Sequence, residues 1–212
     1  MGEIIFKTII DKVKFNFVPV TDLRDGSVYG YKIIKSFDEA GYDDKEDVYE
    51  LAYEDGVLEF FLLRLQEKAY QAAIKEKLTD KKIFHTLRAN YIEDAAYYYA
   101  GIESLIAKFQ LNKDNIVYEI KGASDWKNLN QFLQYTDEDA VLMFKEMKGF
   151  PLNQNMLRFL EPQFAEVASL ESAKILKNNK HITSKIVYKI REGEKYTNKE
   201  LLEAGIDYTY KL

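Results

Sequence analysis

The chain has 212 residues and a hydrophobic content of 47%, which is enough to build one sizeable core, so we expect a single domain spanning 1–212. A net charge of −5 with both signs interspersed argues against a nucleic-acid or anionic-membrane surface, because both need a basic face. The lack of cysteine excludes disulfides and thiolate chemistry, and no apolar run is long enough for a membrane helix; with no signal-peptide pattern at residues 1–10, we expect a cytoplasmic protein.

Short runs of β-branched and aromatic residues alternate with longer stretches of helical pattern, as is typical of a sheet built from βα units. The strands predicted from these runs cover residues 14–20, 28–34, 82–87, 115–120, 140–144, 164–170, 185–190 and 207–211. The turn dipeptide Asp25-Gly26 joins the first two, so we expect that pair to be antiparallel. The others are far enough apart for crossover connections. Because a full barrel typically needs about 250 residues, the pattern predicts a compact TIM-like (β/α) barrel with an antiparallel first strand pair.

Helical periodicity fills the segments between these strands. Apolar residues recur at helical spacing over 58–73 and again over 91–109, and we expect both stripes to pack against the sheet. Near the end of the chain, Thr197 and Glu200 have the spacing of a capping box, which predicts a helix start. Gly205 then fits the left-handed residue that follows a helix.

The helix predicted over 58–73 carries a second apolar stripe, offset from the first, and the next helix extends its aromatic face in a similar way. A helix that is apolar on two faces is either sandwiched between layers or docks a partner. The sequence leaves both interpretations open. The second one predicts a protein partner or a homodimer, with an interface formed by Phe60, Leu63, Tyr70 and Tyr97.

The most informative pattern is a series of motifs in a fixed order. Residues 17–26 read FVPVTDLRDG and residues 28–34 read VYGYKII; later, residues 116–122 read IVYEIKG and residues 200–208 read ELLEAGIDY. These segments resemble the "QP(I/V)-D-L-G", "G-Y-E-A-L", "L-x-L-E-I-T-E" and "L-x-x-L-G-(V/I)-D-Y" motifs of the EAL domain, a bacterial module that hydrolyses cyclic di-GMP. The resemblance covers nearly the whole chain, with gaps, and implies an EAL-type barrel.

The resemblance also implies a catalytic Mg²⁺ or Mn²⁺ held by carboxylates at the strand ends, but this chain departs from that pattern. Lys32 stands where the "G-Y-E-A-L" motif has a metal-binding glutamate. Thr86 falls at the family's metal asparagine, Lys145 near its paired aspartates, and Glu166 near its catalytic lysine. At these four positions the residue that the family uses for metal binding or catalysis is therefore replaced.

Two carboxylates match the family pattern, Glu119 and Glu192, while the second glutamate of "E-I-T-E" becomes Gly122. Two carboxylates on separate strands do not make a dinuclear site. A lysine about 4 Å from a divalent cation would be repelled by roughly 8 kcal/mol at an effective dielectric constant of about 20. We therefore expect no metal, no cofactor and no phosphodiesterase activity. Glu119 either pairs with Lys32 across the strand ends or both are solvated at the barrel mouth.

The leading hypothesis is a non-catalytic EAL-like regulatory or protein-interaction module in cyclic di-GMP-related signalling. The alternatives are a non-catalytic cyclic di-GMP receptor and a metal-dependent phosphodiesterase with a rearranged site. Against nucleotide binding, the family's first-strand glutamine is Val18 here and its phosphate-binding arginine is Ser36. The candidate ligand-binding residues at the barrel mouth are Lys32, Lys35, Glu119 and Glu192.

Overall fold

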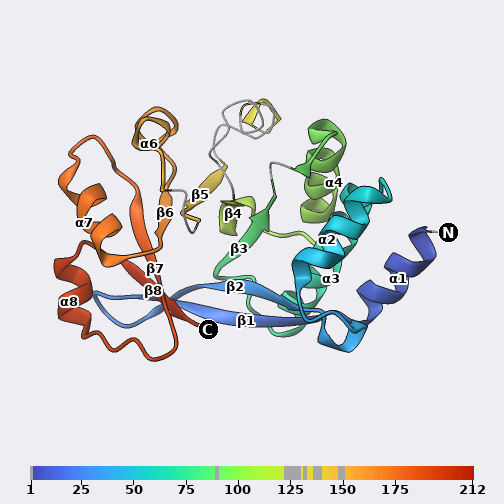
Figure 1. Cartoon of the computed structure of the whole chain (residues 1–212), viewed down its shortest axis with the longest axis horizontal. Helices are drawn as coiled ribbons and strands as arrows, with labels where there is room; N and C mark the ends of the chain where they lie inside the picture. Colours follow the sequence, from blue (N-terminus) through green and yellow to red (C-terminus); the bar gives the residue numbers. More distant parts are fainter. Residues whose placement is uncertain (1, 89–90, 122–129, 131–132, 136–139, 148–150) are drawn as a thin grey trace.

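The computed structural model describes residues 2–88, 91–121, 130, 133–135, 140–147 and 151–212. These residues form a closed barrel in which the strands follow one another in sequence order (Figure 1). The strands are β1 (Lys14–Asp22), β2 (Val28–Ser36), β3 (Lys82–Leu87), β4 (Ile116–Lys121), β5 (Val141–Lys145), β6 (Phe164–Val167), β7 (Lys185–Ile190) and β8 (Tyr208–Lys211). All the predicted strands are confirmed, although β6 ends at Val167 and not at residue 170.

The hairpin between β1 and β2 is antiparallel, as predicted. Its turn places Gly26 at a φ of 75°, a conformation that glycine adopts without steric cost, and the Gly26 amide donates to the Asp22 carbonyl at 2.9 Å. β1 also pairs antiparallel with β8, which closes the barrel, whereas each pair from β2 to β8 is parallel. The carboxyl ends of β2 to β8 therefore meet at one mouth.

Helices surround the barrel: α1 (Gly2–Lys12), α2 (Lys45–Glu54), α3 (Leu58–Lys75), α4 (Ala95–Lys108), α6 (Gln154–Leu160), α7 (Leu170–Asn178) and α8 (Asn198–Glu203). The predicted capping box is present, with Thr197 accepting from the Glu200 amide, and Gly205 follows α8 at a φ of 92°. Two expectations need correction. The sequence did not predict α1, and Tyr91 is an exposed residue that precedes α4. No helix in the described part of the chain is long and apolar enough to cross a membrane.

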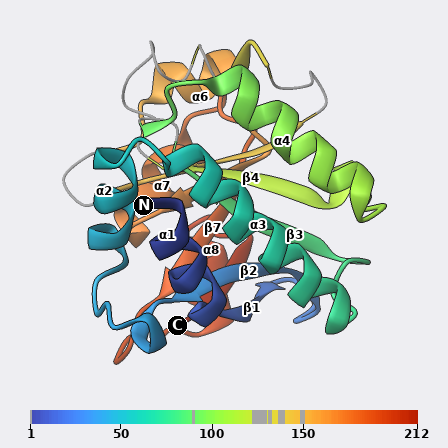
Figure 2. The ribbon, with the colours of Figure 1, turned by 90° about the vertical axis from the view of Figure 1, so that its right-hand side faces the viewer.

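The α3 helix is sandwiched between other helices, which accounts for the burial of Tyr70 and the partial burial of Leu63 in its second apolar stripe. It contacts α1, α2 and α4, and Figure 2 shows it running between them. Tyr70 is 1% exposed, with its hydroxyl 3.3 Å from Nδ1 of buried His85, so its assignment to an exposed interface is wrong. Leu63 packs against Gly101 of α4, where an added Cβ would lie 2.6 Å from Cδ1 of Leu63. Phe60 is half-buried and Tyr97 is exposed.

Candidate ligand site at the barrel mouth

The inward-facing residues of the strands form two levels. Successive side chains of a strand point to opposite faces, so residues two positions apart share a face. The lower level is apolar and fills the barrel with Phe84, Val117, Met143, Phe164, Val187 and Tyr208. Two residues further along the same strands lie Thr86, Glu119, Lys145, Glu166, Lys189 and Tyr210. β2 adds Lys32, so the mouth gathers polar and charged groups from β2 to β8 above an apolar plug.

A buried network of two ammonium groups and two carboxylates lies at the centre of this mouth. Lys32 is 3% exposed, and its Nζ lies 2.9 Å from Oε2 of Glu119 as an ion pair without a well-aligned hydrogen bond. The same Nζ donates to Oε2 of Glu166. Lys145 Nζ lies 3.1 Å from Oε1 of Glu119 and 2.8 Å from Oε1 of Glu166. Of the two arrangements that the sequence left open, the structure shows the pairing of Lys32 with Glu119, and each carboxylate has two cationic partners.

Tyr210 of β8 completes this network. Its hydroxyl donates to Oε1 of Glu166 at 2.8 Å, and Lys32 Nζ lies 4.2 Å from the centre of its ring. The ring therefore presents its electron-rich face to the ammonium group, which adds a cation–π attraction to the two ion pairs. Lys32 is held from three sides.

The pKa shifts of Lys32, Glu119 and Lys145 show that each of these three groups is stabilised in its charged form by its oppositely charged partners. Burial alone would lower the pKa of Lys32, but the charges of Glu119 and Glu166 outweigh burial and raise it. Burial alone would raise the pKa of Glu119, yet Lys32 and Lys145 bring it down to about 2. The pKa of Lys145 is raised in the same way as that of Lys32, because the negative charges of Glu119 and Glu166 outweigh the effect of burial. All three groups are therefore charged at neutral pH.

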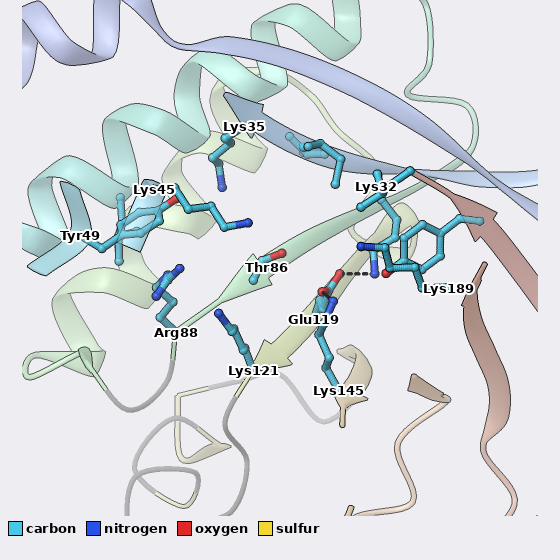
Figure 3. Close-up of a pocket in the computed structure, with 15 residues that line it drawn as sticks. Lys32, Lys35, Lys45, Tyr49, Thr86, Arg88, Glu119, Lys121, Lys145 and Lys189 are labelled. Atoms are coloured by element: carbon cyan, nitrogen blue, oxygen red, sulfur yellow. Dashed lines mark hydrogen bonds and ion pairs between the residues drawn. The ribbon is translucent and has the colours of Figure 1, made fainter. Parts of the chain in front are cut away.

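A cavity of about 210 Å³ opens beside this network. It is lined by Lys32, Ile33, Ile34, Lys35, Lys45, Tyr49, Leu62, Thr86, Arg88, Glu119, Lys121, Lys145, Lys189, Tyr210 and Leu212. In Figure 3 the charged ends of Lys35, Lys45, Arg88 and Lys121 are directed toward the space near Thr86, while Glu119 and Lys145 lie together with Lys32 on the other side. The cavity thus has an inner half, built on the buried network, and an outer half lined by further cations.

Among the described residues, the cations of the outer half have one carboxylate partner, Glu46 of α2. The Arg88 guanidinium binds it with both Nη atoms, and Nη2 donates to Oε1 at 2.7 Å. Lys121 Nζ donates to the same Oε1 at 3.1 Å. Hydrogen bonding from Arg88 is the main reason that the pKa of Glu46 falls to about 2. Arg88 also lies over the ring of Tyr49, 3.9 Å from the guanidinium carbon to the ring centre.

Most of the site residues predicted from the sequence converge at this mouth. Lys35, Thr86 and Lys145 line the cavity together with Lys32 and Glu119, and Glu166 binds Lys32 from the inner side. Glu192 is the exception. It is exposed in the segment after β7 and does not line the cavity, so its assignment to the ligand site is wrong. Gly122 lies outside the described residues.

Several residues of the site were missed at the sequence level. Lys189 and Tyr210 could have been found, because each lies two positions after an inward-facing apolar residue of its strand. Lys121 and Arg88 lie at or just after strand ends, where loop geometry decides the direction of a side chain. Lys45 and Glu46 begin α2, and no local pattern predicts where that helix start lies relative to the barrel.

The donor set does not fit a divalent metal. Mg²⁺ and Mn²⁺ bind oxygen ligands, usually including one or two free carboxylates in addition to waters and substrate phosphates. Among the described residues, no group of three or more histidine, aspartate and glutamate side chains could hold a metal ion. Glu119 and Glu166, which could supply such oxygens, both bind the ammonium group of Lys32.

Comparison with known proteins identifies the fold. No family model matches the sequence, and no curated protein is significantly similar to it. Among solved structures, the EAL domain of FimX from Xanthomonas citri, in complex with cyclic di-GMP, has a TM-score of 0.73 at 12% identity, with 99% of this chain and 90% of that chain covered. The phosphodiesterase PaMucR, also in complex with cyclic di-GMP, has a TM-score of 0.73 at 13% identity, covering 94% of each chain.

YkuI from Bacillus subtilis, a protein with an EAL domain that was solved with cyclic di-GMP and calcium, has a TM-score of 0.71 at 15% identity. The match covers 100% of this chain and 56% of that one. At these identities the similarity is one of fold. The chain has the closed, mixed α/β barrel of EAL domains, as the sequence motifs predicted.

Proposed function

We propose that this chain is a non-catalytic EAL-like regulatory domain in cyclic di-GMP-related signalling, which acts by binding and not by hydrolysis. The observation that carries the proposal is the ammonium group of Lys32, which lies between the carboxylates of Glu119 and Glu166. A divalent ion would have to displace a cation that is already paired with both carboxylates.

The chemistry of an ammonium group explains why this arrangement does not support hydrolysis. In metal-assisted phosphodiester cleavage, the ion lowers the pKa of a bound water and holds the phosphate oxygens through open coordination positions. Lys32 supplies one fixed positive charge and no coordination position for water. Its pKa is raised by its carboxylate partners, so it also does not serve as a base at neutral pH.

A second candidate function is that of a non-catalytic cyclic di-GMP receptor, and the cationic lining of the cavity favours it. FimX, PaMucR and YkuI share the fold and were solved with this nucleotide. A phosphodiester carries negative charge, and the cavity offers lysine and arginine side chains from several elements. This candidate is compatible with the first proposal, because a receptor does not need a metal.

Regulation through a protein partner or a homodimer is a further part of the proposal. Tyr97 of α4 is 53% exposed and is the strongest candidate for such a contact, with half-buried Phe60 of α3 as the second. Exposed tyrosine is enriched at interfaces because it brings a large contact area at low entropic cost. Light scattering of the wild type and of a Tyr97→Ser variant would test this part: a dimer that the substitution dissociates supports it, and a monomer in both cases contradicts a homodimer.

The test of the main proposal is a hydrolysis assay with cyclic di-GMP in Mg²⁺ and, separately, in Mn²⁺, with chromatographic detection of the linear dinucleotide. PaMucR serves as the positive control. We expect no linear product from this chain under conditions in which PaMucR consumes the substrate. Metal-dependent turnover that disappears in EDTA would contradict the proposal and would support the rearranged phosphodiesterase instead.

A further inference from the structure

The outer half of the cavity carries more positive charge than its carboxylates balance. The cationic side chains that line the whole cavity are Lys32, Lys35, Lys45, Arg88, Lys121, Lys145 and Lys189. The inner pair, Lys32 and Lys145, is matched by two carboxylates. In the outer half, the described residues place four cations beside one carboxylate, that of Glu46, which pairs with Arg88 and Lys121. Lys189, the seventh cation, belongs to neither group, so most of the surplus among the described residues lies in the outer half, in a chain whose net charge is −5.

Lys35 and Lys45 are the two members of the outer half for which the described residues provide no ion-pair partner. Lys35 is half-buried at the end of β2, and Lys45 is the first residue of α2. A partly desolvated ammonium group without a counterion is unfavourable, and neighbouring like charges increase that cost. An anion that entered the cavity would relieve it. The pKa of Lys35 reflects this unfavourable environment, because burial and then the charges of Arg88 and Lys45 lower it to about 8.

We propose that the outer half of the cavity is a metal-independent binding site for a phosphate group, formed by Lys35, Lys45 and Lys121 with Arg88 as a fixed neighbouring charge. The inference rests on the proposed function, since it takes the central position to be filled by Lys32 and not by a metal. Phosphate is favoured over a larger anionic group because the cavity holds about 210 Å³, less than the 300 Å³ at which drug-sized pockets begin.

The roles of the four cations differ. Both Nη atoms of Arg88 bind Glu46, and its guanidinium lies over Tyr49, so Arg88 contributes charge from a fixed place. Lys35 and Lys45 have ammonium groups available to donate to phosphate oxygens. Lys121 donates to Glu46 at 3.1 Å and can share its remaining protons with the ligand. Hydrogen bonds between ammonium and phosphate are charge-assisted and are among the stronger contacts in proteins.

The experiment is a calorimetric titration of the full chain with inorganic phosphate in EDTA at neutral pH. The informative variant is Lys35→Gln/Lys45→Gln, because neither lysine has an ion pair with another described residue to lose. The matched control is Lys7→Gln/Lys174→Gln, which changes the net charge equally at two exposed lysines that do not line the cavity. Chemical denaturation of all three proteins is measured alongside.

We expect the wild type to bind one phosphate and Lys35→Gln/Lys45→Gln to bind it at least roughly tenfold more weakly, since each lost contact is a charge-assisted hydrogen bond. The control should bind like the wild type. The stability of Lys35→Gln/Lys45→Gln should be equal to or higher than that of the wild type, because the substitutions remove like-charge repulsion. Equal weakening in the control, or no binding by the wild type at millimolar phosphate, would overturn the proposal.

Competition identifies the source of the phosphate group. If cyclic di-GMP displaces inorganic phosphate, the site holds a phosphodiester of that nucleotide; if a simple phosphomonoester displaces it and cyclic di-GMP does not, the site holds a terminal phosphate. Either result supports the subsite. Binding that required Mg²⁺ or Mn²⁺ would refute this inference. Hydrolysis of cyclic di-GMP together with metal-free phosphate binding would refute only the proposed function, so the two failures are distinguishable.

Discussion

Lys32 on β2 and Glu119 on β4 form a buried ion pair, with Nζ 2.9 Å from Oε2 and side chains that are 4% and 3% exposed. The two residues come from strands that are not neighbours in the barrel, because β3 lies between them. The pair therefore forms across the mouth. The pair occupies the carboxylate of Glu119, and the described residues contain no group of three or more His, Asp or Glu side chains that could hold a metal ion.

Lys32→Met should destabilise the protein by about 3–5 kcal/mol, because removing one partner leaves a buried carboxylate without full compensation. Urea denaturation followed by circular dichroism measures the change. Lys32→Met/Glu119→Gln should cost less than Lys32→Met alone, since Lys145 and Glu166 then remain as a balanced pair. If the cost of Lys32→Met/Glu119→Gln equals the sum of the costs of Lys32→Met and Glu119→Gln, the two side chains are not energetically coupled and the prediction is wrong.

Acid should weaken the protein through Glu119. Its pKa is about 2 in the folded state against an ordinary value of 4.5, so the carboxylate contributes stability that is fully present above pH 4.5 and is lost as the pH falls toward 2. The unfolding free energy of the wild type should therefore fall more steeply over this range than that of Lys32→Met/Glu119→Gln. Glu46, whose pKa is also about 2, titrates in both proteins and does not affect the difference. Equal slopes would contradict the assignment.

Phosphate binding should take up protons near pH 8. In the protein without ligand, the pKa of Lys35 is lowered to about 8, first of all by burial. The neighbouring charges of Arg88 and Lys45 also lower this pKa, and the charge of Glu119 raises it. A bound anion would favour the charged ammonium, so affinity should fall as the pH rises above 8. Calorimetry at pH 8 in buffers of different ionisation enthalpy measures the proton uptake. Lys35→Gln should show less uptake than the wild type, and equal uptake would contradict the role of Lys35.

Gly30→Ala should disturb the pairing of β2 and β3 that positions Lys32. A Cβ at this position would lie 2.4 Å from the carbonyl oxygen of Lys82, a backbone atom that cannot move cheaply. We expect a loss of at least about 1–3 kcal/mol in thermal or urea denaturation, the usual cost of overpacking. The matched control is Gly26→Ala, where the φ of 75° costs about 1 kcal/mol but no atom lies within 4 Å. A smaller loss at Gly30 than at Gly26 would argue against the steric explanation.

The sequence predicted the barrel because its strands are marked by local patterns. β-branched runs fixed the strand positions, and Asp25-Gly26 fixed the antiparallel hairpin. α1 was missed because no helix-start pattern precedes Phe6 and Ile9, whose burial depends on packing against the rest of the fold. Local propensity accounts for the first result and tertiary context for the second.

The candidate site was predicted in part, and the limit again lies in long-range contacts. The charge reversal at Lys32 suggested a pair with Glu119 as one of two arrangements, and the structure shows that pair. The bond from Lys32 to Glu166 spans 134 positions in the chain, and the sequence pattern identifies Glu166 only as a position near which the EAL family has a catalytic lysine. Lys35 and Lys45 line the same cavity because of the path that the chain takes between β2 and α2, and no periodic sequence pattern predicts that path.

The most direct test of the account is the binding of Mn²⁺ to the metal-free wild-type chain, measured by the electron paramagnetic resonance signal of the free ion, with PaMucR as the comparison. We expect the signal to be the same with and without an equimolar amount of this chain at micromolar metal, since Lys32 fills the position between Glu119 and Glu166. Stoichiometric loss of the signal at micromolar Mn²⁺, abolished by Glu119→Gln, would contradict the account.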